Sequence, residues 1–234
     1  MRTAAVLPVK RFARAKRRLG ASVADGLRLE LARAMVADVL LALERSRWIE
    51  RTIVVTRERS VALATRERGA IVVEDDAESG QPAAASLGVR RALAEGFDRV
   101  LCVPGDCPAL DPAELDALLG PPAGPQPAGA CTAEVVIVPD RHGRGTNGLL
   151  LCPPDAIPPA FGPDSCERHR ALALAAGVAC RVERLPSLLL DIDTGADLAA
   201  LRDRLTGQTA GAAGTRAVLG QPERTEVLSI TTPA

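Results

Sequence analysis

The chain has 234 residues and a formal net charge of zero, and hydrophobic residues make up 47% of it, which is ample for a core. Aromatic residues make up only 2%, so the core must be aliphatic and base stacking on aromatic side chains is nearly excluded. The neutral charge argues against a general nucleic-acid-binding or membrane-surface protein.

The apolar stretch after Met1 is short and is broken by Pro8 and Lys10, so it does not resemble a signal peptide. No run approaches the length needed to cross a bilayer. The six cysteines have no C-x-x-C pairing and no nearby histidine at zinc spacing; they are Cys102, Cys107, Cys131, Cys152, Cys166 and Cys180. We therefore expect a cytoplasmic protein whose cysteines are mostly reduced core thiols.

Short apolar β-type runs alternate with helical patterns along most of the chain. Strands are expected at 4–9, 52–56, 70–73, 99–103, 134–138, 148–151 and 178–185. Helices are expected at 25–45, 61–68, 83–94, 112–119, 165–176 and 196–205. The β-α alternation of the first half predicts an α/β fold with a mostly parallel sheet flanked by helices.

The composition changes after residue 205, where Gly, Ala, Thr and Gln dominate and apolar periodicity is weak. We therefore expect one domain over residues 1–205 and a poorly ordered tail over 206–234, with a short docking segment near 227–230. The Pro- and Gly-rich stretch 120–129 is expected to be a surface connection inside the domain.

A basic loop follows the first expected strand. The only two lysines of the chain, Lys10 and Lys16, lie in it, and residues 2–18 include seven basic side chains and no acidic one. A basic loop at the end of the first strand of an α/β chain suits a polyphosphate. The alternative is a solvated basic loop.

Three carboxylates follow aliphatic runs. Asp106 lies in the turn after the run 99–103, at the end of a parallel strand where open α/β sheets bind ligands. Asp191 and Asp193 alternate across Ile192 and share one face in an extended conformation. Such carboxylates repel each other unless a cation lies between them, and a hard divalent ion is the simplest candidate. The alternatives are a turn cap for Asp106 and a helix cap for Asp193.

Two further segments are candidates for anion binding. Residues 143–148 satisfy G-x-G-x-x-G, but the run that follows predicts a strand and not a helix, so we exclude a dinucleotide fingerprint. An anion loop that presents Thr146 fits better. Ser165 is expected to cap the next helix, and Gly162 and the free backbone amides at the helix start would bind an anion. The alternative is that Ser165 is a helix cap with no ligand beside it. Neither His142 nor His169 is assigned a role.

A phosphate-binding basic loop, three carboxylates and an anion-binding helix start together suit metal-dependent nucleotidyl transfer. The sequence also resembles the CofC/FbiD guanylyltransferases of coenzyme F-420 biosynthesis over about residues 3–205. The resemblance rests on L-P-V-K at 7–10, A-K-R-R-L at 15–19, P-G-D-C-P at 104–108, P-D-R-H-G-R-G-T-N at 139–147, F-G-P-D-S at 161–165 and D-I-D-T at 191–194.

The resemblance implies a single-domain, Rossmann-like nucleotidyltransferase fold of the GT-A type. It implies transfer of GMP from GTP to the phosphate of a small three-carbon acid, with pyrophosphate release. The acid would be phosphoenolpyruvate, 2-phospho-L-lactate or 3-phosphoglycerate, and we favour phosphoenolpyruvate. We expect GTP and the phosphorylated acid as partners, and from the neutral charge no nucleic acid and no membrane. A homodimer and hand-off of the product to the next enzyme of the pathway are possible.

Site residues also follow from the resemblance. Asp106, Asp191 and Asp193 are similar to the family's Mg²⁺ ligands, and Asp106, Lys10 and Lys16 are the expected catalytic residues, with the lysines on the GTP phosphates. The expected contacts to the phosphorylated acid are Thr146, Gly162 and Ser165.

One position departs from the family pattern. In the stretch 80–85, Pro82 occupies a position at which members often have Asn. This departure puts the contacts to guanine, or the activity itself, in question. The alternatives are another metal-dependent nucleotidyltransferase, of molybdenum-cofactor or sugar-phosphate type, or a non-catalytic nucleotide-binding protein of the same fold.

Overall fold

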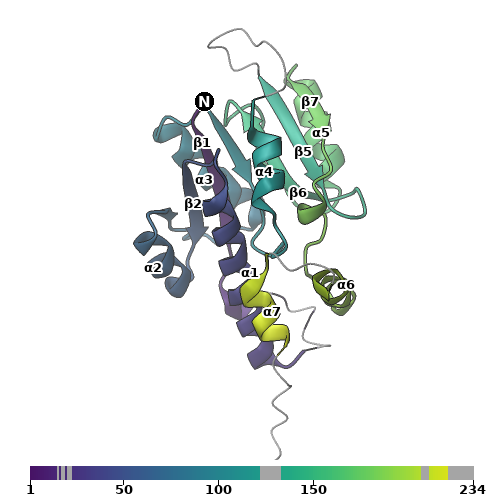
Figure 1. Ribbon diagram of the computed structural model, residues 1–234. Coiled ribbons are helices and arrows are strands. Elements are labelled where there is room, and N and C mark those ends of the chain that lie inside the picture. Colours follow the sequence, from purple (N-terminus) through teal and green to yellow (C-terminus); the bar gives the residue numbers. More distant parts are fainter. Residues whose placement is uncertain (15, 17–18, 20–22, 122–132, 207–210, 221–234) are drawn as a thin grey trace, which may run out of the picture.

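Figure 1 shows the computed structural model, which describes residues 1–14, 16, 19, 23–121, 133–206 and 211–220. Within them, seven strands form one sheet in the order β3-β2-β1-β4-β6-β5-β7. The strands are β1 (Thr3–Val9), β2 (Arg51–Thr56), β3 (Ile71–Val73), β4 (Arg99–Cys102), β5 (Glu134–Pro139), β6 (Thr146–Cys152) and β7 (Ala179–Val182). Each lies where the sequence predicts a strand.

The helices are α1 (Asp25–Arg45), α2 (Arg59–Glu67), α3 (Gln81–Ala94), α4 (Pro112–Leu119), α5 (Ser165–Ala175), α6 (Gly195–Thr206) and α7 (Ala213–Leu219), with short 3₁₀ turns η1 (Phe12–Arg14) and η3 (Pro186–Leu188). Helices α1 to α6 also lie where they are expected, whereas α7 falls in the expected tail. No helix in the described ranges is both long and apolar enough to span a membrane.

The sheet is mostly parallel, as predicted. β1 pairs in parallel with β2 and β4, β2 with β3, and β5 with β7, whereas β6 runs antiparallel to β4 and β5. The chain first builds outward from β1 to β3 and then returns to place β4 on the other side of β1. Open α/β sheets bind ligands at such a reversal, beyond the carboxyl ends of the strands.

Alternate residues of the strands face two apolar layers. Leu7 of β1 belongs to the cluster that packs under α1 and α4, whereas its neighbour Val6 belongs to the cluster under α3 and α5. A third cluster joins α1 to α6 through residues such as Met35, Ile192 and Leu201. This third cluster anchors the segment 190–193 beside the end of the sheet.

The cysteines agree with the expected core thiols in most cases. Cys102, Cys107 and Cys166 are free and buried, and Cys180 is free and exposed. Cys152, however, is disulfide-bonded, which differs from the expectation of a reduced thiol.

The expected tail contains ordered structure. Residues 211–220 include α7, which packs against α1 (Figure 1). Asp38 of α1 is buried, and its two carboxylate oxygens accept hydrogen bonds from the backbone N–H groups of Gly214 (2.9 Å) and Thr215 (2.8 Å). The expectation of a disordered tail is therefore wrong for this part, because a carboxylate from α1 satisfies free amides at the start of the helix. The expected docking segment 227–230 lies outside the described residues.

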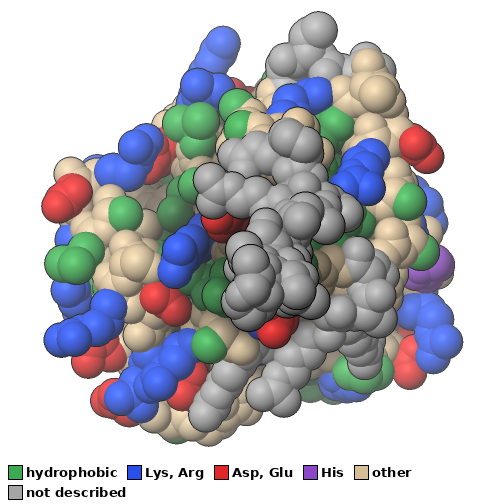
Figure 2. Space-filling model, turned by 90° about the horizontal axis from the view of Figure 1, so that it is seen from below, with side chains coloured by type: hydrophobic (Ala, Val, Ile, Leu, Met, Phe, Trp, Pro, Cys, Tyr) green, Lys and Arg blue, Asp and Glu red, His purple; other side chains and the backbone are tan. Residues whose placement is uncertain are grey.

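Figure 2 shows the molecule from the side toward which β1 runs. Basic and acidic side chains are interspersed over the visible part of that face, in line with the zero net charge. Any phosphate-binding charge must therefore be local to a cleft.

Gly88 of α3 lies close against the sheet. A Cβ added at Gly88 would lie 2.3 Å from Cγ1 of Val6, whereas one added at Gly26 in α1 would meet no atom within 4 Å. We therefore expect Gly88→Ala to lower the free energy of unfolding by about 1–3 kcal/mol through overpacking. Gly26→Ala, the matched control, is expected to be neutral or to stabilise by up to about 1 kcal/mol.

Urea unfolding of both variants measures the effect. The Gly88→Ala, Val6→Ala double variant is expected to lose less than the sum of the single losses, since the smaller side chain makes room for the new methyl. Equal stability of the Gly88→Ala and Gly26→Ala variants would contradict the close packing of α3 on β1.

Candidate active site

A cleft of about 730 Å³ opens at the carboxyl edge of the sheet, between the ends of β1 and β4 and the start of β6. All eight residues predicted as site residues line it: Lys10, Lys16, Asp106, Thr146, Gly162, Ser165, Asp191 and Asp193. The volume is within the range of small-molecule sites. Residues from five separate parts of the chain thus meet in one place.

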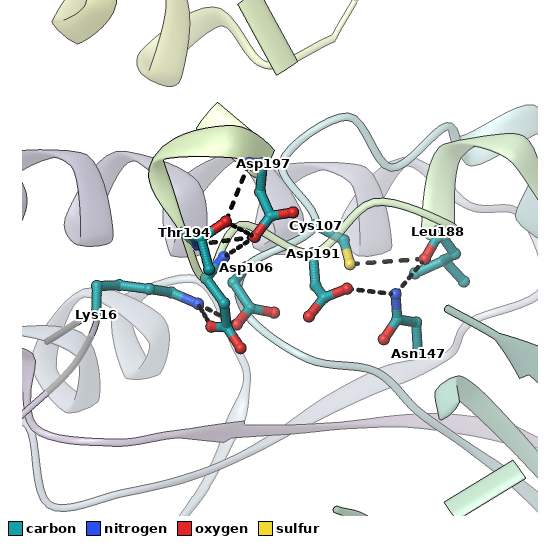
Figure 3. A network of polar contacts seen from close by, with 9 residues as sticks. Lys16, Asp106, Cys107, Asn147, Leu188, Asp191, Thr194 and Asp197 are labelled. Atoms are coloured by element: carbon teal, nitrogen blue, oxygen red, sulfur yellow. Dashed lines mark hydrogen bonds and ion pairs between the residues drawn. The ribbon is translucent and has the colours of Figure 1, made fainter. Parts of the chain in front are cut away.

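The Lys16 ammonium lies between two of the predicted carboxylates (Figure 3). Nζ donates to Oδ2 of Asp106 and, at 2.8 Å, to Oδ1 of Asp193. The lysine side chain is only 9% exposed. Burial alone would lower the pKa of Lys16, but the two carboxylates outweigh it and raise the pKa above its ordinary value. The site therefore holds a fixed positive charge.

The backbone connects the two carboxylate-bearing segments. Asp106 follows β4, and its carbonyl oxygen accepts a hydrogen bond from the Ile192 N–H at 3.1 Å. Ile192 is fully buried in the third apolar cluster, so Asp191 and Asp193 on either side of it are held at the cleft. The alternation seen in the sequence thus does place both carboxylates on the cleft.

Asp191 is held by an amide that the sequence analysis did not single out. Asn147 Nδ2 donates to Asp191 Oδ1 (3.2 Å) and to the carbonyl oxygen of Leu188 (2.8 Å), as Figure 3 shows. Burial raises the pKa of Asp191, and the neighbouring Asp106 carboxylate raises it further. The signal in the sequence was the position of Asn147 directly after Thr146, at the start of β6.

The three aspartates fit a hard cation in chemistry, although they are not arranged as a ready cage. In the described part of the chain, no three His, Cys, Asp or Glu side chains are placed to hold a metal ion. Yet Asp106 Oδ1 is buried without a hydrogen-bond partner among the described residues, and two of the carboxylates already share one ammonium. Oxygen ligands of this kind are what Mg²⁺ prefers.

Asp197, also not predicted, fixes the backbone next to Asp193. Thr194 and Asp197 form a reciprocal cap at the start of α6. Asp197 Oδ2 accepts hydrogen bonds from the N–H groups of Thr194 (2.7 Å) and Asp193 (3.1 Å). Thr194 Oγ1 in turn accepts one from the Asp197 N–H (3.3 Å). Asp193 is therefore not the helix cap, and its side chain is left for Lys16. The T-x-x-D spacing at 194–197 was the available signal.

The segment 139–147 is a tight loop closed by Asp140. Its carboxylate accepts from the N–H groups of His142 and Arg144, both at 3.0 Å. A Cβ on Gly145 would lie 2.7 Å from Asp140 Oδ2, so only glycine fits there. The loop leads into β6 and not into a helix, which confirms that G-x-G-x-x-G is no dinucleotide fingerprint here.

The start of α5 differs from the expectation of free backbone amides. Asp164, not Ser165, is the N-cap residue, with φ of 55°. The N–H of Ser165 donates to the Gly162 carbonyl (3.1 Å) and that of Cys166 to the Arg144 carbonyl (3.0 Å), so these first amides are occupied. Gly162 takes φ of 123°, which favours glycine.

Two buried hydroxyl groups lie at this end of the cleft. The Ser165 side chain is 1% exposed, and its Oγ has no hydrogen-bond partner among the described residues. Thr146 is also buried, and its Oγ1 lies 3.0 Å from Nδ1 of His169. Buried hydroxyls at a cleft wall are ready to bind a polar group of a ligand.

The comparisons with known proteins show the family. Residues 3–209 match the family described as "Guanylyl transferase CofC like". The chain is 50% identical to a phosphoenolpyruvate guanylyltransferase of Conexibacter woesei, over 96% of this chain and 98% of the relative, and 38% identical to one of Sphaerobacter thermophilus, over 85% and 91%.

Solved structures support the fold. A putative nucleotide-diphospho-sugar transferase from Desulfovibrio desulfuricans superimposes with a TM-score of 0.71 at 17% identity, covering 94% of each chain. A nucleotidyl transferase from Methanothermobacter gives a TM-score of 0.58 at 24% identity, covering 88% of this chain and 99% of the other. The Rossmann-like nucleotidyltransferase fold is thereby confirmed.

The cap at Asp197 gives a pH-dependent prediction. Burial raises the pKa of Asp197, but the hydrogen bonds from Thr194 and the backbone and the ion pair with Arg141 outweigh it, so the pKa lies below its ordinary value. The resulting stability is present above the ordinary carboxyl pKa of about 3.9 and is lost as the pH falls through the lower pKa of the folded state. Asp197→Asn is therefore expected to cost about 1–2 kcal/mol at neutral pH.

Urea unfolding from neutral pH down to about pH 2 tests this linkage, and the difference from wild type is expected to shrink only in the acid range. Asp203→Asn, at an exposed position of the same helix, is the control and is expected to have little effect. A difference that grows as the pH falls would contradict the role given to the ionised Asp197.

Proposed function

The chain belongs to the CofC family of guanylyl transferases, and from this premise we propose that it transfers GMP from GTP to the phosphate of phosphoenolpyruvate, releasing pyrophosphate. The observation that carries the proposal is the meeting of Lys16, Asp106 and Asp193 with two buried hydroxyls in one cleft. The relatives' names support phosphoenolpyruvate over the two other acids. The family places the reaction in coenzyme F-420 biosynthesis.

The cleft divides into two ends of different chemistry. Lys10, at the end of β1, and Lys16 supply positive charge for the GTP phosphates, next to Asp106. Thr146 and Ser165 supply hydroxyls, near Gly162, for the anionic groups of the acceptor. The acceptor phosphate would then face the α-phosphate of GTP across the middle of the cleft.

The acceptor's phosphate oxygen is already an anion near neutral pH, so no side chain must deprotonate it. The chain's contribution is to align two mutually repelling phosphates and to neutralise their charge. The lysines stabilise the departing pyrophosphate in this scheme.

Asp106, Asp191 and Asp193 would hold Mg²⁺, which neutralises charge on the α-phosphate when bound. The Lys16 ammonium binds the same carboxylates of Asp106 and Asp193 that would coordinate the ion. Ammonium and divalent ion therefore compete for those oxygens. Displacement of Lys16 from the carboxylates would leave its charge available for the phosphates.

Pyrophosphate release tests the proposed reaction. Purified protein with Mg²⁺ and GTP is expected to release pyrophosphate with phosphoenolpyruvate, and much less with 2-phospho-L-lactate, 3-phosphoglycerate, or with ATP or CTP in place of GTP. Release with a different acceptor would correct the substrate and keep the reaction class. Folded protein that binds GTP but releases no pyrophosphate with any acceptor would favour a non-catalytic nucleotide-binding protein.

Competition between Lys16 and the ion is tested by Mn²⁺ binding, followed by electron paramagnetic resonance without nucleotide. Lys16→Met is expected to bind Mn²⁺ at least about tenfold more tightly, because the competing charge is gone. Its turnover is expected to fall by about 10² or more, because the phosphates lose a cation. Lys16→Arg keeps the charge and is the matched control for the Mn²⁺ measurement.

Asp193→Asn is expected to weaken Mn²⁺ binding in the same experiment, since an amide is a poorer ligand for a hard cation than a carboxylate. Unchanged Mn²⁺ affinity in the Asp193→Asn variant would remove this residue from the metal site. Unchanged affinity in Lys16→Met would show that the ammonium and the ion do not share ligands.

A further inference from the structure

His169 is a buried polar residue of α5 that has no role in the reaction as proposed above. Its side chain has 0% exposure, and both ring nitrogens are engaged. Phe161 contacts the ring edge to face, with centroids 5.3 Å apart. The imidazole is therefore held in one orientation, directly behind the acceptor end of the cleft.

The position of the proton on the ring follows from the hydrogen bond at Nε2. The backbone N–H of Ala160 lies 2.9 Å from Nε2, and a backbone N–H can only donate. Nε2 must therefore accept and carries no proton, so the ring is neutral with its proton on Nδ1. Burial, with a smaller contribution from the Arg168 charge, lowers the pKa of His169 to about 4, which agrees with a neutral ring at physiological pH.

The proton on Nδ1 in turn decides what Thr146 does. Nδ1–H donates to Thr146 Oγ1 at 3.0 Å, so the hydroxyl accepts from the histidine and cannot donate to it. Thr146 lines the cleft, and its own hydroxyl proton is left for a group there. With the other tautomer, the hydroxyl would donate to the ring and turn a lone pair toward the cleft.

We propose that His169 is a positioning residue that fixes the Thr146 hydroxyl as a hydrogen-bond donor to an anionic oxygen of the acceptor, an inference that rests on the proposed function. Three donors then point the same way, from the Ala160 N–H through the His169 ring to the Thr146 hydroxyl. Hydrogen bonds in such a chain polarise one another, which strengthens the last donor. A hydroxyl so fixed has its own proton free to donate to an anionic oxygen.

The ring tautomer can be measured without substrate. The chain has only two histidines, so ¹⁵N-labelled histidine gives two ring systems, and a His142→Gln variant identifies that of His169. We expect the His169 ring to be protonated on Nδ1 only, with no titration in the neutral range. A proton on Nε2, or protonation near the ordinary histidine pKa of about 6.5, would overturn the proposal.

Ligand binding gives a second reading that does not depend on turnover. Phosphoenolpyruvate added to the wild-type protein is expected to shift the Nδ1–H signal of His169, because the hydrogen bond from Thr146 to the anion polarises the chain. In Thr146→Val, which has no hydroxyl, the signal is expected not to move. An equal shift in both proteins would overturn the proposal.

Two matched variants separate positioning from structural support. In His169→Asn the amide lies near the place of Nδ1 and can still donate to Thr146, whereas in His169→Gln it lies near the place of Nε2 and can only replace the contact to Ala160. We expect His169→Gln and Thr146→Val each to lower kcat/KM for the acceptor by about ten- to hundredfold, with KM for GTP unchanged. His169→Asn is expected to stay close to wild type.

The double variant Thr146→Val, His169→Gln is expected to be no worse than either single variant, because the two residues act through one hydrogen bond. Additive losses, or equal losses in His169→Asn and His169→Gln, would overturn the proposal. Absence of pyrophosphate release by wild type with every acceptor would instead refute the proposed function, and the tautomer and the ligand-induced shift would still decide the role of His169.

Discussion

The constraint on which this molecule depends is the repulsion among carboxylates gathered at the end of its sheet. Parallel strands bring their carboxyl ends to one edge, so Asp106 after β4 meets Asp191 and Asp193, which come much later in the chain. Like charges this close raise each other's pKa unless a cation is present. Here the cation is an internal one, the buried ammonium of Lys16, which binds two of the three carboxylates. A divalent ion would take the place of this ammonium between the carboxylates. Metal binding and release of the lysine toward the phosphates therefore belong to one event in the proposed reaction.

A second group of carboxylates accepts hydrogen bonds from backbone N–H groups. Asp140 closes the loop before β6, Asp197 closes the turn before α6, and Asp38 receives the first amides of α7. Each satisfies backbone N–H groups that have no partner within a helix or strand, and each carries a negative charge close to positive backbone dipoles. Asp140 and Asp197 fix the backbone of the two segments that carry Thr146 and Asp193. Irregular loops therefore form part of the cleft, and carboxylates bind their backbone N–H groups.

Much of this was readable in the sequence. Apolar periodicity gave every strand and helix of the domain, because α1 and the parallel strands are long or continuously apolar, and all eight predicted site residues line one cleft. What the sequence could not give were side-chain directions and long-range partners. Nothing local indicates that Lys16 reaches across to Asp193, or that His169 turns its ring toward Thr146, since each contact joins residues far apart in the chain or on different elements. The expectation of free backbone amides at the start of α5 was wrong, because carbonyl groups of neighbouring loops accept hydrogen bonds from the first amides.

Pro82 fits the backbone where it lies. It is the second residue of α3, after the N-cap residue Gly80 (φ of 103°) and Gln81, and a proline there removes no helical hydrogen bond because the first N–H groups of a helix have no partner within it. The residues of this turn that line the cleft are Gly80, Gln81 and Ala84, whereas Pro82 is not among them. Pro82 therefore suits the helix start, and Gln81 is the residue of this turn that has an amide side chain and lines the cleft. The departure from the asparagine pattern thus leaves the cleft itself intact.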